Sequence, residues 1–279
     1  MKKFLIVANL NKENSACIAN KVKKALDEKG AKADVFSYDV FEEKNVKAIC
    51  ENAEKAECII IVGGDGTLLR TSRAISGLNK PILGVNSGHL GFLCDVDEER
   101  IEEAVEKLLS GNITIENRMM LEGTVNNETR LSLNDAVIFR SGQLRTIALK
   151  VYVDSQLLTI IHGDGIVIAT PTGSTGYSMS CGGPILDPSS EMIVMTPCAP
   201  HSLSMRSVVL NPDSFIEIEI EDHDETVNKG DILLSFDGEN AIKVDNKSKI
   251  KIKRAKDCIK LIRIRQTGFL ELLHNKMGS

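Results

Sequence analysis

Short apolar runs punctuate the first 115 residues, with helical periodicity between them. Ile18, Val22 and Leu26 recur at helical spacing and lead to Gly30, a residue type that commonly ends helices. Continuous apolar runs are typical of parallel strands that are covered on both faces. The pattern predicts an α/β domain with a parallel sheet. The expected strands are 4–7, 33–38, 58–62 and 81–85, and the expected helices are 15–29, a segment from Thr67 onward, and 97–111, which Asp97 would cap.

From about residue 116 the period of the pattern changes to two. Residues 147–153 and the segment FIEIEIE at 215–221 alternate between two faces, as antiparallel strands do. No convincing helical periodicity is found from 116 to 245, so we expect an all-β, sandwich-like domain at 116–259 after an α/β domain at 1–115. The final stretch TGFLELLHNKM is apolar, and residues 260–279 are expected to pack back on the first domain.

The segment KIKIKR at 249–254 is the one strongly basic stretch. It suits either a polyanion site or a strand with Ile250 and Ile252 inward and lysines outward. We favour the strand, because the acidic FIEIEIE segment offers a complementary cross-strand neighbour.

Composition narrows the class of partner. The chain has 279 residues, 42% of them apolar, which is enough for one large domain or two ordinary ones. A net charge of -5 argues against nucleic acid or a membrane surface as partner and favours a small molecule. Seven scattered cysteines without a CxxC pair indicate reduced thiols in a cytoplasmic protein. No apolar stretch approaches the length of a membrane span.

The segment GGDGT follows a buried-looking strand and resembles a phosphate-binding loop. Gly63, Gly64 and Gly66 allow the backbone to approach a ligand, and a helix from Thr67 would point its N-terminus at the same place. The segment matches neither the Walker loop nor GxGxxG. An ordinary tight turn is the alternative, but the attached Asp-Gly-Thr favours a function. Asp65 places a negative charge in this anion loop.

Residues 160–185 are the densest in candidate chemistry. Asp164 lies between two glycines before an apolar strand, and residues 172–176 offer hydroxyl and backbone donors suited to phosphate or ribose. Tyr177 adds an aromatic face for a base. Three other positions have simpler interpretations. Taken alone, Asn134-Asp135 is typical of a bulge or turn, and Asp237 is typical of a hairpin turn. We expect His201 to make a structural hydrogen bond.

Together the motifs resemble the NAD kinase family. They are GGDGT, VNSGHLGFL at 85–93, Asn134-Asp135, GDG at 163–165, TPTGSTGYSMSCGGPI, PHSLS and the late Asp-Gly turn, in order from about residue 59 to 240. GGDGT is shared in related form with diacylglycerol kinases, sphingosine kinases and phosphofructokinases, whereas TPTGSTGYS after a GDG strand is more specific. The resemblance implies transfer of the γ-phosphoryl group of ATP, or of polyphosphate in some members, to the 2′-hydroxyl of the adenosine ribose of NAD. It also implies Mg²⁺ or another divalent cation with ATP, without direct protein ligands, and a homodimer or homotetramer.

The resemblance also implies roles for particular residues. Asp65 is the expected proton acceptor, Phe92 lies where an aromatic residue is near adenine, and Asp164 matches an aspartate at the nicotinamide half. Asn134-Asp135 hold the ribose and adenine side, 175–180 wrap the dinucleotide, and Arg145 and His162 lie near its phosphates. The implied NAD contacts are Asp65, Gly66, Phe92, Asn134, Asp135, Arg145, His162, Asp164, Thr175, Gly176, Tyr177, Ser178, Ser180 and Glu239.

Three of these positions depart from the family pattern. Gly176 replaces the usual alanine, His162 stands where arginine is common, and Glu239 replaces a frequent glutamine. Because histidine titrates near neutrality, His162 exchanges a permanent charge for one that depends on pH.

Two other functions fit the motifs. A lipid or other small-molecule kinase could use the same GGDGT loop, although the chain lacks an obvious amphipathic membrane helix. A non-catalytic dinucleotide sensor could keep the binding loops, although the intact Asp65 argues against it. Formation of NADP from NAD and ATP would distinguish both from an NAD kinase.

Overall fold

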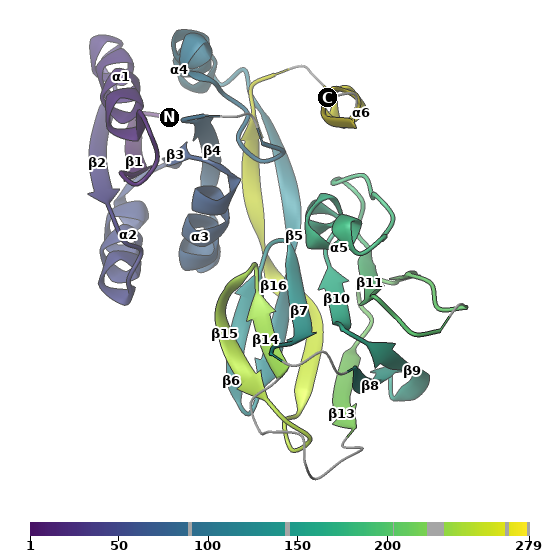
Figure 1. Cartoon of the computed structure of the whole chain (residues 1–279). Coiled ribbons are helices and arrows are strands. Elements are labelled where there is room, and N and C mark those ends of the chain that lie inside the picture. Colours follow the sequence, from purple (N-terminus) through teal and green to yellow (C-terminus); the bar gives the residue numbers. More distant parts are fainter. Residues whose placement is uncertain (89–90, 143–145, 203, 222–231, 266–267, 278–279) are drawn as a thin grey trace. The chain divides into compact units, whose positions relative to one another are not determined.

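The computed structural model describes residues 1–279 except 89–90, 143–145, 203, 222–231, 266–267 and 278–279. These residues form two compact units (Figure 1). The first comprises Met1–Arg118 and Asp257–Ser279, and the second comprises Met119–Lys256. The chain therefore leaves the first unit once and returns to it at its C-terminal end.

The first unit consists of a parallel sheet and the helices that pack on it. The strand order in this sheet is β2-β1-β3-β4-β16, and each neighbouring pair is parallel. The predicted α/β domain with a parallel sheet is confirmed. Its elements are β1 (Lys3–Asn9), α1 (Ser15–Glu28), β2 (Lys32–Tyr38), α2 (Glu43–Lys55), β3 (Cys58–Gly63), α3 (Asp65–Ile75), η1 (Ser76–Leu78), β4 (Pro81–Asn86), η2 (Glu98–Arg100), α4 (Ile101–Ser110), the end of β16 (Ile250–Arg263) and α6 (Phe269–Met277).

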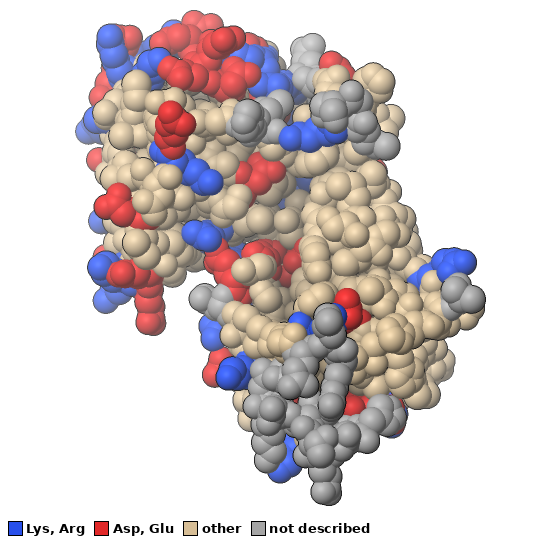
Figure 2. Space-filling model, in the orientation of Figure 1, with Lys and Arg blue, Asp and Glu red and all other residues tan. Residues whose placement is uncertain are grey.

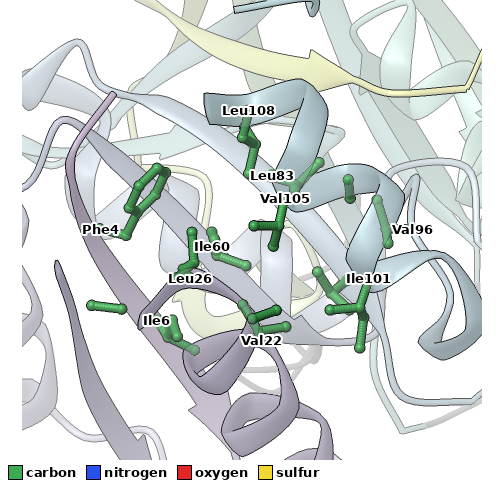
Figure 3. Close-up of a cluster of buried hydrophobic side chains, with 14 of the residues drawn as sticks. Phe4, Ile6, Val22, Leu26, Ile60, Leu83, Val96, Ile101, Val105 and Leu108 are labelled. Carbon is green, nitrogen blue, oxygen red and sulfur yellow. The ribbon is translucent and has the colours of Figure 1, made fainter. Parts of the chain in front are cut away.

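Helices cover this sheet on both faces, which explains the continuous apolar runs. Phe4 and Ile6 of β1 share one buried cluster with Val22 of α1 and Val105 of α4 (Figure 3). The alternate residue Leu5 is also buried, although successive strand residues point to opposite faces. α2 and α3 pack together and contact β1, β3 and β4. Each large apolar side chain buried in this way contributes about 1.5–3 kcal/mol relative to exposure.

The helices of the first unit differ from the prediction in three respects. α2 was not predicted, because Ile49 and Ala53 are its only fully buried side chains and leave a weak pattern. α3 begins at Asp65 rather than Thr67. Asp97 is the N-cap residue of η2 at the start of the predicted helix 97–111, but its side chain makes no cap hydrogen bond and pairs with Arg265 instead.

The second unit is a β sandwich whose two layers share a buried core, with a second, smaller cluster around Val167 and Cys198. One layer is a sheet with the strand order β12-β11-β10-β7-β14-β15. The opposing layer contains the strands β16-β13-β8-β9, in that order, and the pair β5-β6. Apolar residues from both sets form one cluster, so the predicted sandwich-like all-β domain is confirmed. The strands are β5 (Thr114–Val125), β6 (Glu128–Ser132), β7 (Asp135–Arg140), β8 (Ile147–Val153), β9 (Gln156–Gly163), β10 (Gly165–Ala169), β11 (Ile193–Cys198), β12 (Val208–Leu210), β13 (Ile216–Glu221), β14 (Ile232–Phe236) and β15 (Glu239–Val244).

Two short helices interrupt the β pattern of the second unit, η3 (Thr172–Thr175) and α5 (Tyr177–Ser180). The expectation of no helix between 116 and 245 missed them, because four residues are too few for a 3.6-residue period to be seen.

The basic segment KIKIKR is a strand, as favoured above. Ile250 and Ile252 are buried in β16, and Glu217 of β13 lies opposite Lys251, with their charged atoms 3.5 Å apart. On the face shown in Figure 2, basic side chains lie singly or in small groups among acidic and uncharged ones. The lysines of this segment therefore serve cross-strand pairing rather than a polyanion site.

The C-terminal segment returns to the first unit. The ring of Phe269 at the start of α6 lies 6.4 Å from that of Phe92, and Lys276 Nζ lies 5.6 Å from the Phe92 ring centroid. The prediction that this segment packs back on the first domain is confirmed. Among the described helices, none is long and apolar enough to cross a membrane.

Candidate functional site

The strand order of the first unit identifies the carboxyl ends of its central strands as a candidate ligand site. The connection from β1 runs to β2 on one side, and the connection from β3 runs to β4 on the other. In such sheets ligands bind at the carboxyl ends of the two strands where the direction reverses. β1 ends at Asn9, and β3 ends at Gly63, directly before Gly64, Asp65 and Gly66. The fold thus places GGDGT at the expected position.

The glycines of GGDGT have different reasons for being glycine. A Cβ on Gly63 would overlap the Thr67 side chain, so packing alone demands glycine there. Gly64 and Gly66 have no heavy atom near the position of a Cβ. Internal packing therefore does not explain them, whereas a ligand that approaches the backbone does. Both lie at the N-terminus of α3, which favours anions.

The carboxylate of Asp65 is held by three consecutive backbone amides. Phe92 N donates to Oδ2 at 2.7 Å, and Leu93 N and Cys94 N donate to Oδ1 at 3.2 and 3.1 Å. A Cβ on Gly91 would overlap this carboxylate, so the motif VNSGHLGFL needs glycine for this close approach. A carboxylate oxygen accepts two hydrogen bonds. Oδ2 accepts only one of these three amide hydrogen bonds, so it is the candidate acceptor for a ligand hydroxyl.

Thr67 lies behind the loop rather than at its surface. Its side chain is buried, its N–H donates to the Gly64 carbonyl at 2.9 Å, and its hydroxyl accepts from Asn9 Nδ2 at 3.2 Å. These contacts fix the loop from behind, and the assignment of Thr67 to the phosphate-binding loop with Gly63, Gly64 and Gly66 stays a prediction. Asn9 was missed by the sequence analysis, although its position at the carboxyl end of β1 was a usable signal.

In the second unit, Asp237 positions the Asn134-Asp135 pair. Its Oδ1 accepts from Asn134 N at 2.7 Å and Asp135 N at 3.2 Å, and its Oδ2 accepts from Leu133 N at 3.0 Å. Asp237 N in turn donates to the Asp135 carbonyl at 2.9 Å. The hairpin turn predicted at Asp237 is present between β14 and β15, with φ of 50° at Asp237 and 73° at Gly238. Its side chain has an additional role that turn chemistry did not indicate.

Asp135 is a buried carboxyl with an unusual protonation equilibrium. Burial, and to a lesser extent the charge of Asp237, raises the pKa of Asp135 from 3.8 to about 7. Near neutral pH it therefore exchanges between a hydrogen-bond donor and an acceptor. Asn134 Oδ1 is buried beside it without a hydrogen-bond partner among the described residues. Because buried polar atoms are normally paired, this oxygen is a candidate acceptor for a ligand donor.

We expect Asp135→Asn to flatten the pH dependence of stability. The folded-state pKa lies above the unfolded value, so the native protein holds more protons between about pH 4 and 7. Wild-type stability should then fall as pH rises through this window, by at most about 1.4 kcal/mol per pH unit from this group. Urea unfolding of both proteins at pH 5, 6 and 7 measures the difference, and parallel stability curves would contradict the assignment.

The loop 172–180 lies against the Asn134-Asp135 pair. A Cβ built on Gly176 would lie 3.6 Å from Asn134 Nδ2 and 3.7 Å from Asp135 Oδ2. Thr175 Oγ1 donates to the Thr172 carbonyl at 3.3 Å, and Ser178 shares a buried 2.9 Å hydrogen bond with Thr196. The structure therefore brings Asn134, Asp135 and Gly176 together, with Tyr177 and Ser180 exposed on α5.

Asp164 has a cationic partner that the sequence analysis missed. Arg140 Nε lies 2.6 Å from Asp164 Oδ1, and Arg140 N donates to the Asp164 carbonyl at 3.0 Å. The ring of Phe139, next to Arg140, lies 6.3 Å from that of Tyr177. Arg140 ends β7, and its position beside Asp164 depends on the pairing of β7 with β10, which one chain segment alone does not reveal.

Two further predicted site residues, His162 and Glu239, lie on strands of the second unit. His162 is exposed on β9, and its carbonyl accepts from His201 N at 2.8 Å. Glu239 begins β15, where its carbonyl accepts from Ser235 Oγ at 3.3 Å. Arg145 lies outside the described residues. Within the described part of the chain, no group of three or more His, Cys, Asp or Glu side chains is arranged to hold a metal ion.

Comparison with known proteins identifies similar chains along the whole length. The model of the ATP-NAD kinase N-terminal domain matches residues 4–113, and that of the ATP-NAD kinase C-terminal domain matches residues 133–264. The NAD kinase of Agathobacter rectalis is 39% identical over 292 residues, covering 100% of this chain and 99% of that protein. The NAD kinase of Lachnoclostridium phytofermentans is 37% identical over 285 residues, with the same coverage of each chain.

Two solved structures share the fold. Yeast NADH kinase complexed with NADH superposes with a TM-score of 0.86, covering 100% of this chain and 88% of that one. An NAD kinase from Archaeoglobus fulgidus in complex with ATP gives a TM-score of 0.75, with 100% and 98% covered. At 22% identity in both cases, this likeness establishes the fold alone.

Proposed function

The chain belongs to the NAD kinase family, and we propose that Asp65 is the group with which it activates the 2′-hydroxyl of NAD. The enzyme transfers the γ-phosphoryl group of ATP to the 2′-hydroxyl of the adenosine ribose of NAD and so forms NADP. The observation that supports the role of Asp65 is its fixed carboxylate, with an accepting position on Oδ2, between the open glycines Gly64 and Gly66.

Asp65 and the glycines have complementary tasks in this mechanism. A ribose hydroxyl is a poor nucleophile at neutral pH, and phosphoryl transfer depends on positioning and charge neutralisation. Asp65 Oδ2 accepts the hydroxyl proton as the oxygen attacks the γ-phosphorus. The backbone N–H groups of Gly64 and Gly66, at the N-terminus of α3, face phosphate oxygens. The three amides that hold Asp65 keep its carboxylate oriented during the transfer.

The second unit supplies the residues that recognise the dinucleotide. Asn134 and Asp135, fixed by Asp237, bind the ribose and adenine side, and Asp164 binds the nicotinamide half. Arg140 keeps the Asp164 carboxylate oriented and supplies a permanent positive charge beside it. The other proposed NAD contacts are Gly66, Phe92, Arg145, His162, Thr175, Gly176, Tyr177, Ser178, Ser180 and Glu239.

We also propose that a divalent cation enters this site with ATP. The phosphate oxygens and water would then coordinate Mg²⁺. When bound, Mg²⁺ neutralises phosphate charge. We also propose a cytoplasmic homodimer or homotetramer; seven free cysteines support a reducing compartment.

The decisive experiment is an assay of NADP formation. We expect the purified chain to produce NADP from NAD, ATP and Mg²⁺, and to lose this activity when the cation is chelated. Parallel reactions with polyphosphate and with NADH define the donor and the acceptor. Binding of NAD without formation of NADP under any of these conditions would contradict a kinase and support a dinucleotide sensor.

A further inference from the structure

Two cysteine side chains meet beside the loop 172–180. Cys181 follows α5 and Cys198 ends β11, and their sulfur atoms are 3.0 Å apart. Both are free thiols. A disulfide S–S bond is about 2.05 Å long. The sulfur atoms therefore need to approach by only about 1 Å to be joined.

The surroundings determine which thiol moves. Cys198 is 3% exposed, and it is paired with Gly165 of β10 at the end of β11. Cys181 is half-buried after a helix of four residues, and two glycines follow it. Cys181 is thus the less constrained of the two residues. When the sulfur atoms are joined, Cys181 moves and the end of α5 shifts toward β11.

Displacement of Cys181 reaches residues assigned to NAD binding. Cys181 N donates to the carbonyls of Tyr177 and Ser178, both at 3.1 Å, so its backbone is continuous with α5. On the other side, the Cys198 carbonyl accepts from Asp164 N at 3.0 Å. The next residue, Ala199, has a φ of 43°, a strained value for alanine of the kind that clusters at functional sites.

We propose that Cys181 and Cys198 form a dithiol modification site that a hydroperoxide converts to a disulfide, lowering the rate of NAD phosphorylation. The loss of rate rests on the proposed function of the loop, whereas formation of the disulfide does not. Because a misplacement of about 1 Å can reduce activity up to 10²-fold, a shift of α5 is sufficient for a large effect.

The chemistry assigns a different role to each thiol. The Cys181 thiolate attacks one peroxide oxygen; an S–O bond forms, the O–O bond breaks and hydroxide leaves. Cys198 sulfur then attacks Cys181 sulfur; the S–S bond forms, the S–O bond breaks and water leaves with the Cys198 proton. The hydroxide takes up the proton that the Cys181 thiol had lost, so two thiols are oxidised and hydrogen peroxide is reduced to two waters. Burial, followed by the contact with Cys181, raises the pKa of the Cys198 thiol, which disfavours its thiolate and leaves Cys181 as the thiol that meets the peroxide.

The test uses the full chain treated with hydrogen peroxide, with Cys181→Ser as the variant and Cys17→Ser, an exposed thiol on α1, as the control. After the remaining thiols are alkylated, mass spectrometry should find the Cys181–Cys198 crosslinked peptide in wild type and in Cys17→Ser. In both, kcat/KM for NAD should fall about 10-fold or more and recover with dithiothreitol. Cys181→Ser should keep its activity after the same treatment.

Two results would overturn the proposal. Alkylation of both Cys181 and Cys198 after peroxide treatment would show that the pair is only packed, as small apolar side chains are. A crosslinked peptide with unchanged kcat/KM would remove the effect on activity. If wild type forms no NADP even when reduced, the proposed function fails, and the peptide map still decides whether the site exists. Cys181→Ala repeats the test should the serine variant unfold.

Discussion

Asp65→Asn is expected to lower kcat by roughly 10²–10⁴-fold while the chain still binds NAD, because a positioned general base is removed. The carboxylate is the only group of GGDGT that can accept a proton. An amide at the same place has almost the same size but cannot take the hydroxyl proton. The measurement is kcat from steady-state NADP formation, together with the dissociation constant for NAD.

The contacts of Asp65 require a control for loss of structure. An asparagine amide at the place of Oδ2 would face the N–H of Phe92, donor against donor, and could loosen residues 92–94. Asp95→Asn is a matched control in the same unit. Asp95 is also a buried carboxylate that accepts two backbone amides, Ile264 N at 2.6 Å and Arg265 N at 2.9 Å, but it lies outside GGDGT.

The two variants should separate catalysis from stability. Both should lose stability, since each leaves backbone amides with a poorer acceptor, and Asp95→Asn also weakens the ion pair of Asp95 with Arg263. Only Asp65→Asn should lose kcat by more than about 10²-fold. A kcat near that of wild type in Asp65→Asn would exclude Asp65 as the proton acceptor, and an equal loss in both variants would make its role structural.

The regular fold could be predicted because the sequence pattern is local. Strands 58–62 and 81–85 were visible as apolar runs since both of their faces are buried, and FIEIEIE alternates since one face is wet. Elements with little buried surface left no such signal. α2 buries few side chains, and α5 has a single helical turn, so both were absent from the prediction.

The candidate site could be predicted in its motifs but not in its supporting contacts. Asp65, Asn134-Asp135 and Asp164 stand in short glycine-rich segments that the sequence displays directly. Their partners are distant in the chain: Asp237 lies more than 100 residues after Leu133, and Arg140 lies 24 residues before Asp164. Periodicity carries no information on such contacts, because they depend on which strands become neighbours.

Asp237→Gly is expected to destabilise the second unit by about 3–5 kcal/mol, because three backbone amides lose a charged acceptor. Glycine is the informative replacement, since the φ of 50° at Asp237 would strain alanine but not glycine. Freed from Asp237, Asn134 and Asp135 should no longer be positioned, and KM for NAD should rise about 10-fold or more. Thermal or urea unfolding and NAD-dependent kinetics measure the two effects.

Asp154→Gly is the matched control for Asp237→Gly. Asp154 also stands in a hairpin turn with positive φ, 51°, but its carboxylate holds one exposed amide, Phe215 N, at 2.9 Å. Its replacement should cost about 1 kcal/mol and leave KM for NAD unchanged. Equal losses in the two variants would mean that both aspartates serve only their turns. If KM rises only in Asp237→Gly, the Asp237 carboxylate must act through residues 133–135. The turn itself cannot explain the rise, because glycine adopts the same positive φ.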